Sequence, residues 1–184
     1  MVRKLAIYGL TGAGKSTTSG VILDLCHARG LTARVEKLAA PLYRLQEDIY
    51  ALVGRTVQPG QQDQELLRAL AEQLRRIEPA YLVNDFLRRT HDTDADLIVN
   101  DDIKDTAVDY PRLVENGFKF LHITCPGDVR AHRLSRRDDL TQAVETSHTW
   151  RFDRIKPDWV LDNSTNDHEQ LRSAVAGILA EWLP

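Results

Sequence analysis

Cysteine and long apolar runs are both scarce in this sequence of 184 residues, and each scarcity narrows the class of protein. The two cysteines, Cys26 and Cys125, have no metal-ligand spacing around them, so we expect reduced thiols rather than a disulfide. No segment approaches the roughly 18 apolar residues of a membrane-spanning helix. The apolar part of the N-terminal stretch is too short for a signal peptide and runs into a glycine-rich loop. These absences indicate a cytoplasmic protein without membrane contact.

The sequence also has no excess of basic over acidic residues. The formal net charge is −3, whereas nucleic-acid-binding domains are usually basic, and we therefore expect no nucleic-acid partner. Hydrophobic residues make up 42% and charged residues 28% of the chain, as in ordinary globular proteins. The length suits one unit with a substantial core, so we expect a single domain over residues 1–184.

Short apolar runs bounded by turn-forming residues recur along the chain and predict strands. They cover residues 4–8, 32–38, 95–100, 118–124 and 158–163. Each run is largely apolar rather than alternating, as expected of strands that are buried on both faces. Helical patterns lie between the runs, and strands alternating with helices predict a three-layer α/β fold with a five-stranded parallel sheet.

Two apolar stripes define the clearest helices. One consists of Leu66, Leu70, Leu74 and Ile77, and the other of Leu171, Val175, Ile178, Leu179 and Trp182. We expect Asn166 to cap the last helix, with Glu169 three positions on. Residues 40–92 have room for three helices where one would suffice for a crossover, and residues 126–157 form a second insertion. We expect an acceptor-binding helical region in the first insertion and a lid in the second.

A glycine-rich loop follows the first expected strand and opens into a helix. Residues 9–16, GLTGAGKS, fit the pattern G-x-x-x-x-G-K-[ST] with the flanking elements that confirm it. Glycines allow the backbone N–H groups to turn towards phosphate oxygens, and the helix start adds partial positive charge. We expect Lys15 to reach the β- and γ-phosphates and Ser16 to ligate Mg²⁺. The expected ATP contacts in this loop are Gly9, Thr11, Gly12, Ala13, Gly14, Lys15, Ser16 and Thr17.

This phosphate loop does not by itself separate kinases from GTPases. A GTPase would need a D-x-x-G motif after the third strand and a late N-K-x-D motif. Residues 102–105, DIKD, lack the glycine, and residues 161–167, LDNSTND, lack the lysine. The sequence therefore argues against a GTPase.

Asp101 and Asp102 follow the third expected strand at its carboxyl end, where open α/β sheets bind ligands. We expect one of them to hold the Mg²⁺ shell or to accept a proton from an attacking hydroxyl, and Asp101 is our candidate metal contact beside Ser16. The sequence does not fix which of the pair faces the site, so both are candidate catalytic residues. The alternative is a turn-forming pair that caps the next helix.

Two groups of arginines lie on segments with helical patterns. Arg68 and Arg75 are seven residues apart and share a helix face. Arg130, Arg133 and Arg137 form a stripe at i, i+3 and i+7 in the lid region. Arginine suits bidentate phosphate contacts and can neutralise charge on a transferring phosphoryl group. A solvated surface paired with acidic neighbours explains the first group equally well, whereas the denser second group favours function.

Several stretches together resemble the phage and bacterial deoxynucleoside monophosphate kinases, within the wider group of nucleoside monophosphate and dephospho-CoA kinases. They are GLTGAGKST (9–17), VEKLAAPLYRL (35–45), RRIEPAYLVNDFLRR (75–89), LIVNDDIKD (97–105) with LVENGFKFLHI (113–123), and SHTWRFDRIKPDWVLDNS (147–164). The first stretch is shared by many families and the others match loosely, but together they cover most of the chain in order.

The resemblance implies roles for individual residues. Arg75 would hold an acceptor phosphate, Asp102 would match a strand-end aspartate, and Lys104 would replace the arginine beside it. The lid would use Arg133 and Arg137, and the segment around Asn163 would lie near the donor base. The candidate acceptor contacts are Lys37, Arg44, Arg68, Arg75, Tyr81 and Lys104.

We therefore predict phosphoryl transfer from ATP·Mg²⁺ to a (deoxy)nucleoside monophosphate, by a monomer or a homodimer with the P-loop αβα fold. A P-loop kinase of dephospho-CoA or of a specialised metabolite is the first alternative, because Lys104 lacks the fork geometry of arginine. A nucleotide-binding switch protein with a protein partner is the second. The two arginine groups favour a kinase over a switch.

Overall fold

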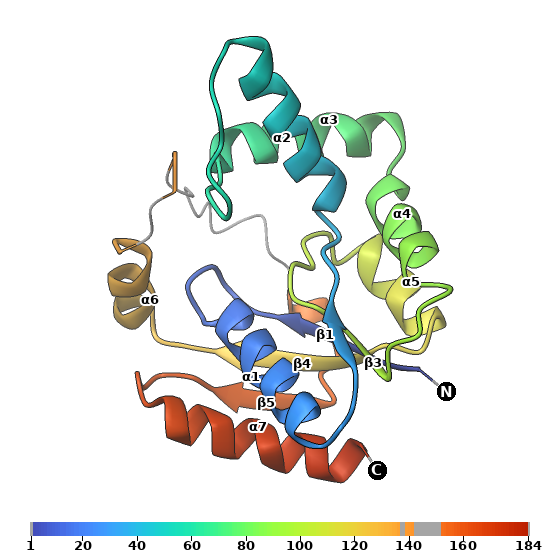
Figure 1. Ribbon diagram of the computed structural model, residues 1–184, viewed down its shortest axis with the longest axis vertical. Helices are drawn as coiled ribbons and strands as arrows, with labels where there is room; N and C mark the ends of the chain where they lie inside the picture. The colour runs from blue at the N-terminus through green and yellow to red at the C-terminus, as the bar shows by residue number, and fades with distance from the viewer. Residues whose placement is uncertain (1, 137–138, 142–151, 184) are drawn as a thin grey trace.

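The computed structural model describes residues 2–136, 139–141 and 152–183, and within them five strands form one sheet. The strands are β1 (Arg3–Tyr8), β2 (Ala33–Val35), β3 (Leu97–Asn100), β4 (Lys119–Thr124) and β5 (Trp159–Asp162). Their order is β2-β3-β1-β4-β5, and every neighbouring pair is parallel (Figure 1). The predicted five-stranded parallel sheet is confirmed. β2 is shorter than the expected run 32–38, because the backbone after Glu36 turns towards the end of β3.

Helices cover both faces of this sheet. α1 (Lys15–Ala28) and α7 (His168–Trp182) pack on one face, and α4 (Tyr81–Arg89) and α5 (Asp109–Glu115) pack on the other. Alternate residues of β1 serve the two cores: Leu5 and Ile7 contact the first pair of helices, whereas Ala6 and Tyr8 lie in the second core. The result is the predicted three-layer α/β arrangement.

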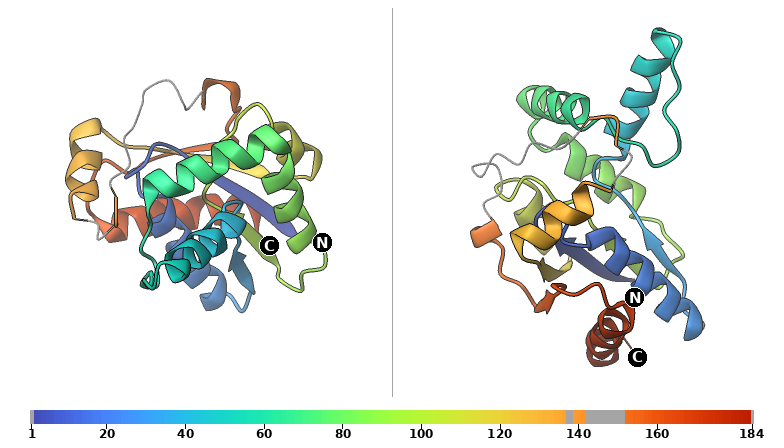
Figure 2. Two further views of the ribbon diagram at one scale, coloured as in Figure 1. Left: turned by 90° about the horizontal axis from the view of Figure 1, so that it is seen from above. Right: turned by 90° about the vertical axis from the view of Figure 1, so that its left-hand side faces the viewer.

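The first insertion stands above the sheet. α2 (Ala40–Leu52), α3 (Gln64–Ile77) and α4 share a small core formed by Leu42, Leu67 and Leu82. Figure 2 shows from two further sides that α2 and α3 occupy the same end of the molecule. The expected stripe on α3 is wrong at both ends. Leu67 is buried in place of Leu66. Ile77 is 79% exposed because it is the last residue of the helix and lies beyond the residues that form the small core.

The stripe on α7 is confirmed, but its expected cap is wrong. Leu171, Val175 and Leu179 are buried in the first core. Asp167 caps the helix, since its carboxylate accepts hydrogen bonds from the amides of Glu169 at 2.9 Å and Gln170 at 3.1 Å. Asn166 instead points its side-chain oxygen at Arg133.

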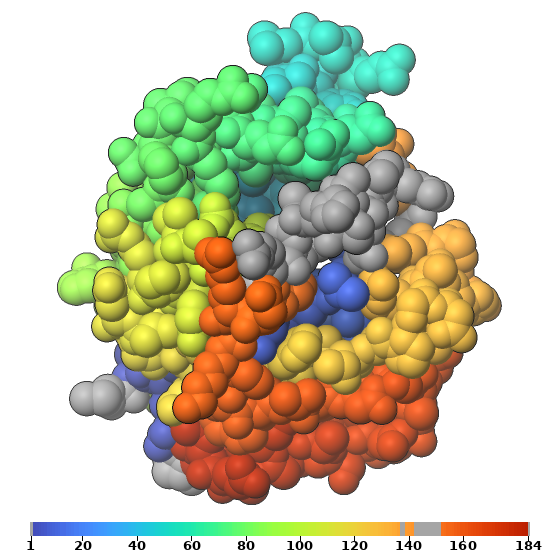
Figure 3. All heavy atoms as spheres, turned by 180° about the vertical axis from the view of Figure 1, so that it is seen from behind, coloured from blue at the N-terminus to red at the C-terminus, as the bar shows by residue number. Residues whose placement is uncertain are grey.

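The remaining described elements follow β4. α6 (Gly127–Leu134) lies at one end of the sheet (Figure 1), and a short 3₁₀ helix, η1 (Phe152–Arg154), precedes β5. Among the described helices, none has the length and apolar character that crossing a membrane would require. From behind, atoms of the N-terminal segment are visible in a hollow between α6 and the segment around η1 (Figure 3).

Candidate active site

The loop between β1 and α1 is shaped by glycines that no other residue can replace. Gly9 has φ +148°, and a Cβ added there would lie 2.3 Å from the Ile123 carbonyl oxygen of the neighbouring strand. Gly14 has φ +99°, and its Cβ would lie 2.2 Å from Nδ2 of Asn163. Both positions combine a left-handed backbone with a close approach, which only glycine accepts. The loop therefore has the backbone that phosphate binding needs.

The start of α1 is open to an anion. Gly14 is the N-cap and offers no side-chain hydrogen bond, and the first turn carries no acidic residue. Ser16 and Thr17 are exposed at this helix end. The Lys15 ammonium donates to the carbonyl oxygens of Gly9 at 2.9 Å and Leu10 at 3.1 Å, so it lies across the mouth of the loop. These groups together supply N–H donors, a helix dipole and a cation to a polyphosphate.

Side chains behind the loop hold its carbonyl groups. Nδ2 of Asn163 donates to the Ala13 oxygen at 2.8 Å, and Arg130 donates to the Thr11 oxygen at 3.0 Å. Arg133 also contacts the Ala13 oxygen, at 3.5 Å, and donates to Thr165 at 2.7 Å. Carbonyls fixed outward leave the loop amides free to face a ligand. Arg133, which the sequence assigned to the lid, thus lies on the outer side of the phosphate loop, beside the expected donor-base segment.

Asp101 and Asp102 have different surroundings. The Asp101 carboxylate accepts a hydrogen bond from the Ser19 hydroxyl of α1 at 3.0 Å and pairs with the Lys37 ammonium. It is only 2% exposed, yet it contacts the helix that follows the phosphate loop. Of the pair, Asp101 is therefore the one aimed at the nucleotide end of α1.

Asp102 instead links the segment after β2 to the end of β3 through hydrogen bonds. Its two carboxylate oxygens accept hydrogen bonds from the amides of Leu38 at 2.8 Å and Ala39 at 2.9 Å. A third bond comes from the Asn100 side chain at 2.6 Å. Burial raises the pKa of the Asp102 carboxyl, which the Ala39 amide and Lys37 oppose. With its oxygens occupied by backbone donors, Asp102 positions the entrance to α2.

The sequence-predicted acceptor residues do not gather at one point. Both terminal nitrogens of Arg75 contact the buried Asp109 carboxylate, at 3.0 and 2.9 Å. Arg68 is largely exposed and pairs with Glu72 at 3.4 Å. The remaining candidates are exposed at three separate places. Arg44 lies on α2, Tyr81 at the start of α4 and Lys104 in the β3–α5 loop.

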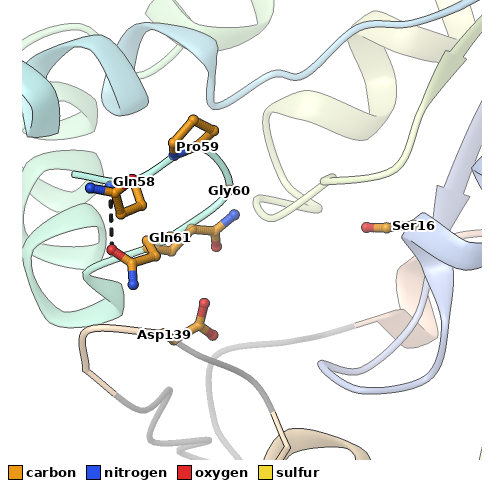
Figure 4. A pocket seen from close by; sticks show the side chains of 7 residues that line it. Ser16, Gln58, Pro59, Gly60, Gln61 and Asp139 are labelled. Atoms are coloured by element: carbon orange, nitrogen blue, oxygen red, sulfur yellow. Dashed lines mark hydrogen bonds between the residues drawn. The ribbon is translucent and has the colours of Figure 1, made fainter.

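A cavity of about 480 Å³ lies between the phosphate loop and the first insertion. Ser16 lines one side, and Gln58, Pro59, Gly60, Gln61, Gln62 and Asp139 line the other. Figure 4 shows the Ser16 side chain on the opposite side of the cavity from the loop of residues 58–61, with the Asp139 side chain near that loop. The sequence analysis gave this polar loop no role. Its run of glutamines beside Pro59–Gly60 was the available signal.

Residues 139–141 contact the start of α3. The Asp63 carboxylate accepts hydrogen bonds from the Leu66 amide at 3.1 Å, the Tyr50 hydroxyl at 2.7 Å and the Thr141 hydroxyl at 2.8 Å. The Leu140 amide donates to the Gln62 carbonyl at 2.9 Å. The two insertions therefore meet over the cavity. Arg137, which the sequence analysis assigned to the lid, lies outside the described residues.

Arg89 and Tyr43 lie next to these residues, and neither is among the site candidates of the sequence analysis. Arg89 binds Asp85 at 2.8 Å, Glu36 at 2.8 Å and the Lys37 carbonyl at 2.6 Å, so it fixes the backbone that carries Lys37. Burial raises the pKa of the Tyr43 phenol, with further contributions from Asp102 and Asp101. The contacts of Arg89 and Tyr43 come from elements far apart in the chain, which explains why local sequence patterns did not identify these residues.

Comparison with solved structures identifies the fold. A sugar kinase from Janibacter sp. has a TM-score of 0.51 at 20% identity, and the match covers 98% of this chain and 95% of that chain. The APS kinase of Mycobacterium tuberculosis, in complex with AMPPNP and APS, has a TM-score of 0.53 at 16% identity over 96% and 97%. Shikimate kinase from Acinetobacter baumannii, in complex with shikimate, has a TM-score of 0.55 at 15% identity over 100% and 97%.

These similarities concern architecture. No family model and no curated protein matches the sequence. At identities of 15–20%, the shared feature is the three-layer αβα fold of P-loop kinases. The chain has this fold.

Proposed function

We propose that the protein is an ATP-dependent P-loop kinase that phosphorylates a small molecule. The observation that carries this proposal is the juxtaposition of an open helix start, with Lys15 across the loop, and a cavity walled by the first insertion and the lid. A nucleotide switch needs the first feature, whereas the second supplies a place for an acceptor. Kinase, transferase and nucleotide-binding roles follow from the two together, and a cytoplasmic location fits an enzyme that consumes ATP.

The residues present fit ATP and Mg²⁺. The Gly9–Thr17 loop and Lys15 suit the triphosphate, while Ser16 is exposed where a phosphate-bound ion would need a hydroxyl ligand. Asp101 would support the ion from the end of β3. Among the described residues there is no group of three or more His, Cys, Asp or Glu side chains suited to a metal, so Mg²⁺ would arrive with ATP. When bound, the ion would neutralise charge on the phosphates.

The proposed kinase function must also specify which class of molecule accepts the phosphate. A nucleoside monophosphate, as the family resemblance implies, needs a cation for its phosphate. Arg75 would have to leave Asp109, and Lys37 would have to leave Asp101, before either could bind it. The neutral loop of Gln58–Gln62 favours the alternative, a metabolite acceptor, since sugar and shikimate kinases share this fold.

The test is ADP release with ATP·Mg²⁺ and a panel of acceptors: ribo- and deoxynucleoside monophosphates, dephospho-CoA, sugars, shikimate and amino alcohols. We expect at least one acceptor to raise the rate above bare hydrolysis. Lys15→Ala should lower kcat by about 10²–10³. Lys119→Ala is the matched control, because Lys119 is half exposed at the start of β4 and pairs with Asp158 there, away from the phosphate loop. A panel without any stimulated turnover, and equal activity of the two lysine variants, would contradict a kinase.

A further inference from the structure

The cavity opposite Ser16 has an unusual composition for a site that receives an anion. From the cavity lining, we infer that the acceptor is a neutral or cationic hydroxyl compound, such as a polyol, a sugar or an amino alcohol. This inference rests on the proposed kinase function and names the chemical class of its acceptor.

The described residues that line the cavity are mostly neutral and polar. Gln58, Gln61 and Gln62 carry carboxamides, each of which donates and accepts hydrogen bonds. Among the described lining residues, the only ionisable side chain is Asp139, and it is acidic. Hydroxyl groups pair with carboxamides in either direction, and a hydroxyl or an ammonium group can donate to Asp139. A phosphate or carboxylate offers only acceptor oxygens and would face a like charge.

Three cations of the first insertion and of the segment before it already have carboxylate partners. Arg75 is committed to Asp109 through both terminal nitrogens and lies 3.6 Å from Asp105 as well. Lys37 pairs with Asp101. Arg89 is held by carboxylates of Asp85 and Glu36 on two elements. Each of these cations therefore already neutralises a carboxylate, and releasing one for an acceptor phosphate would leave a buried carboxylate without its partner.

Tyr43 lies beside the wall of the cavity. Its hydroxyl forms a hydrogen bond with Gln62, and the Asp139 carboxylate acts on the phenol electrostatically. An anionic acceptor at this wall would be repelled by Asp139, whereas a neutral or cationic acceptor would not.

The chemistry is a simple transfer. The acceptor hydroxyl oxygen forms a bond to the γ-phosphorus of ATP while the bond from that phosphorus to the β–γ bridging oxygen breaks. ADP leaves with the electron pair of the broken bond, and the hydroxyl proton passes to solvent. The products are a phosphate monoester, ADP and one proton, so no oxidant or other co-reactant is needed.

The class can be tested before the acceptor is identified. A deproteinised bacterial metabolite extract is passed over an anion-exchange resin at pH 8, which retains nucleotides, dephospho-CoA and other anions. The full-length protein is then incubated with γ-³²P-labelled ATP, Mg²⁺ and either the retained or the unretained fraction. We expect Lys15-dependent label transfer to a new anionic product from the unretained fraction. Transfer from the retained fraction alone overturns this inference and leaves the kinase intact. Transfer from neither fraction overturns the proposed function and this inference with it.

A variant pair links the acceptor class to the cavity. Asp139→Asn should reduce transfer from the unretained fraction by about ten-fold at limiting acceptor, because it removes a charged hydrogen-bond acceptor. Asp128→Asn is the matched control, since Asp128 is an exposed carboxylate at the start of α6 and does not line the cavity. Circular dichroism spectra of both variants establish that they fold. Equal rates in a folded Asp139→Asn protein and its Asp128→Asn control would overturn the assignment of the acceptor to this cavity.

Discussion

Ser19 donates its hydroxyl hydrogen bond to Asp101 at 3.0 Å, and this contact ties the end of β3 to the helix that follows the phosphate loop. The same carboxylate pairs with Lys37 from the segment after β2. Two strand ends and one helix are therefore connected through a single buried group next to the proposed nucleotide site. We therefore propose that Asp101 acts in catalysis, whereas Asp102 stabilises the fold.

Replacing each aspartate should separate these two roles. Asp101→Asn should lower kcat by about ten-fold or more while leaving the fold intact, because the shape is kept and the charge is lost. Asp102→Asn should chiefly destabilise the protein, by about 1–3 kcal/mol, since an amide cannot accept both backbone N–H bonds. Steady-state kinetics and urea unfolding of both variants give the comparison. A large loss of kcat in a stable Asp102→Asn protein would reverse the assignment.

Gly14 and Gly20 provide a matched pair on one helix. Gly14→Ala places a Cβ 2.2 Å from Asn163 Nδ2 in a left-handed backbone, so we expect ATP binding to be lost. The double variant Gly14→Ala/Asn163→Ala removes the close contact but keeps the backbone strain, and should not restore binding. Gly20→Ala has no atom within 4 Å of the new Cβ and should stabilise α1 by about 0.5–1 kcal/mol. Calorimetric titration with ATP and thermal unfolding measure the two effects. Normal ATP binding by Gly14→Ala would contradict the geometry of the loop.

The parts of the site that the sequence predicts are those whose chemistry is local. Gly9, Gly14 and Lys15 lie within one short loop, so their spacing alone indicates a phosphate site. The strands of the sheet could be predicted in the same way, because each short apolar run is recognisable in the sequence without knowing which strand it pairs with. The sequence could not separate Asp101 from Asp102, since the difference depends on where the amides of residues 38 and 39 lie after the fold forms.

The acceptor side of the site was less predictable for a related reason. Arg75 matches a phosphate-binding residue by its neighbours in sequence, but its actual partner, Asp109, lies 34 positions away on α5. The cavity wall joins the loop of residues 58–62 to Asp139, and these meet only because the two insertions dock. Contacts between insertions are set by tertiary packing, and no local periodicity reports them.

The Arg75–Asp109 pair makes a testable distinction between structure and substrate binding. Arg75→Met should destabilise the protein by about 3 kcal/mol, because it leaves a fully buried carboxylate without its cation. Adding Asp109→Asn should recover much of that loss. For the active acceptor, KM should change by less than about three-fold once each variant is folded. Unfolding curves and kinetics on the same preparations decide between the roles. A KM raised a hundred-fold for a nucleoside monophosphate, with stability unchanged, would show that Arg75 binds the acceptor phosphate.

The contact of residues 139–141 with α3 should depend on pH through Asp63. Burial would raise the pKa of this carboxyl, but hydrogen bonds from the Leu66 amide and from the Tyr50 and Thr141 hydroxyls outweigh it and lower the pKa below 3.8. A lowered folded pKa means that the stabilisation is present above the ordinary value of 3.8 and is lost as the pH falls through the folded value. Asp63→Ala should therefore cost about 1 kcal/mol at pH 7, as the loss of a helix cap does.

The difference in the free energy of unfolding between the native chain and Asp63→Ala should shrink as the pH falls below 3.8. Asp48→Ala is the control, because Asp48 is exposed on α2, and its effect should stay within about 0.5 kcal/mol at any pH. Urea unfolding at several pH values between 7 and 3 measures both differences. If the Asp63→Ala difference stays constant over this range, the Asp63 carboxylate is not what holds Thr141 against α3, and the other contacts of residues 139–141 with Gln62, Gln64 and Glu65 hold them there.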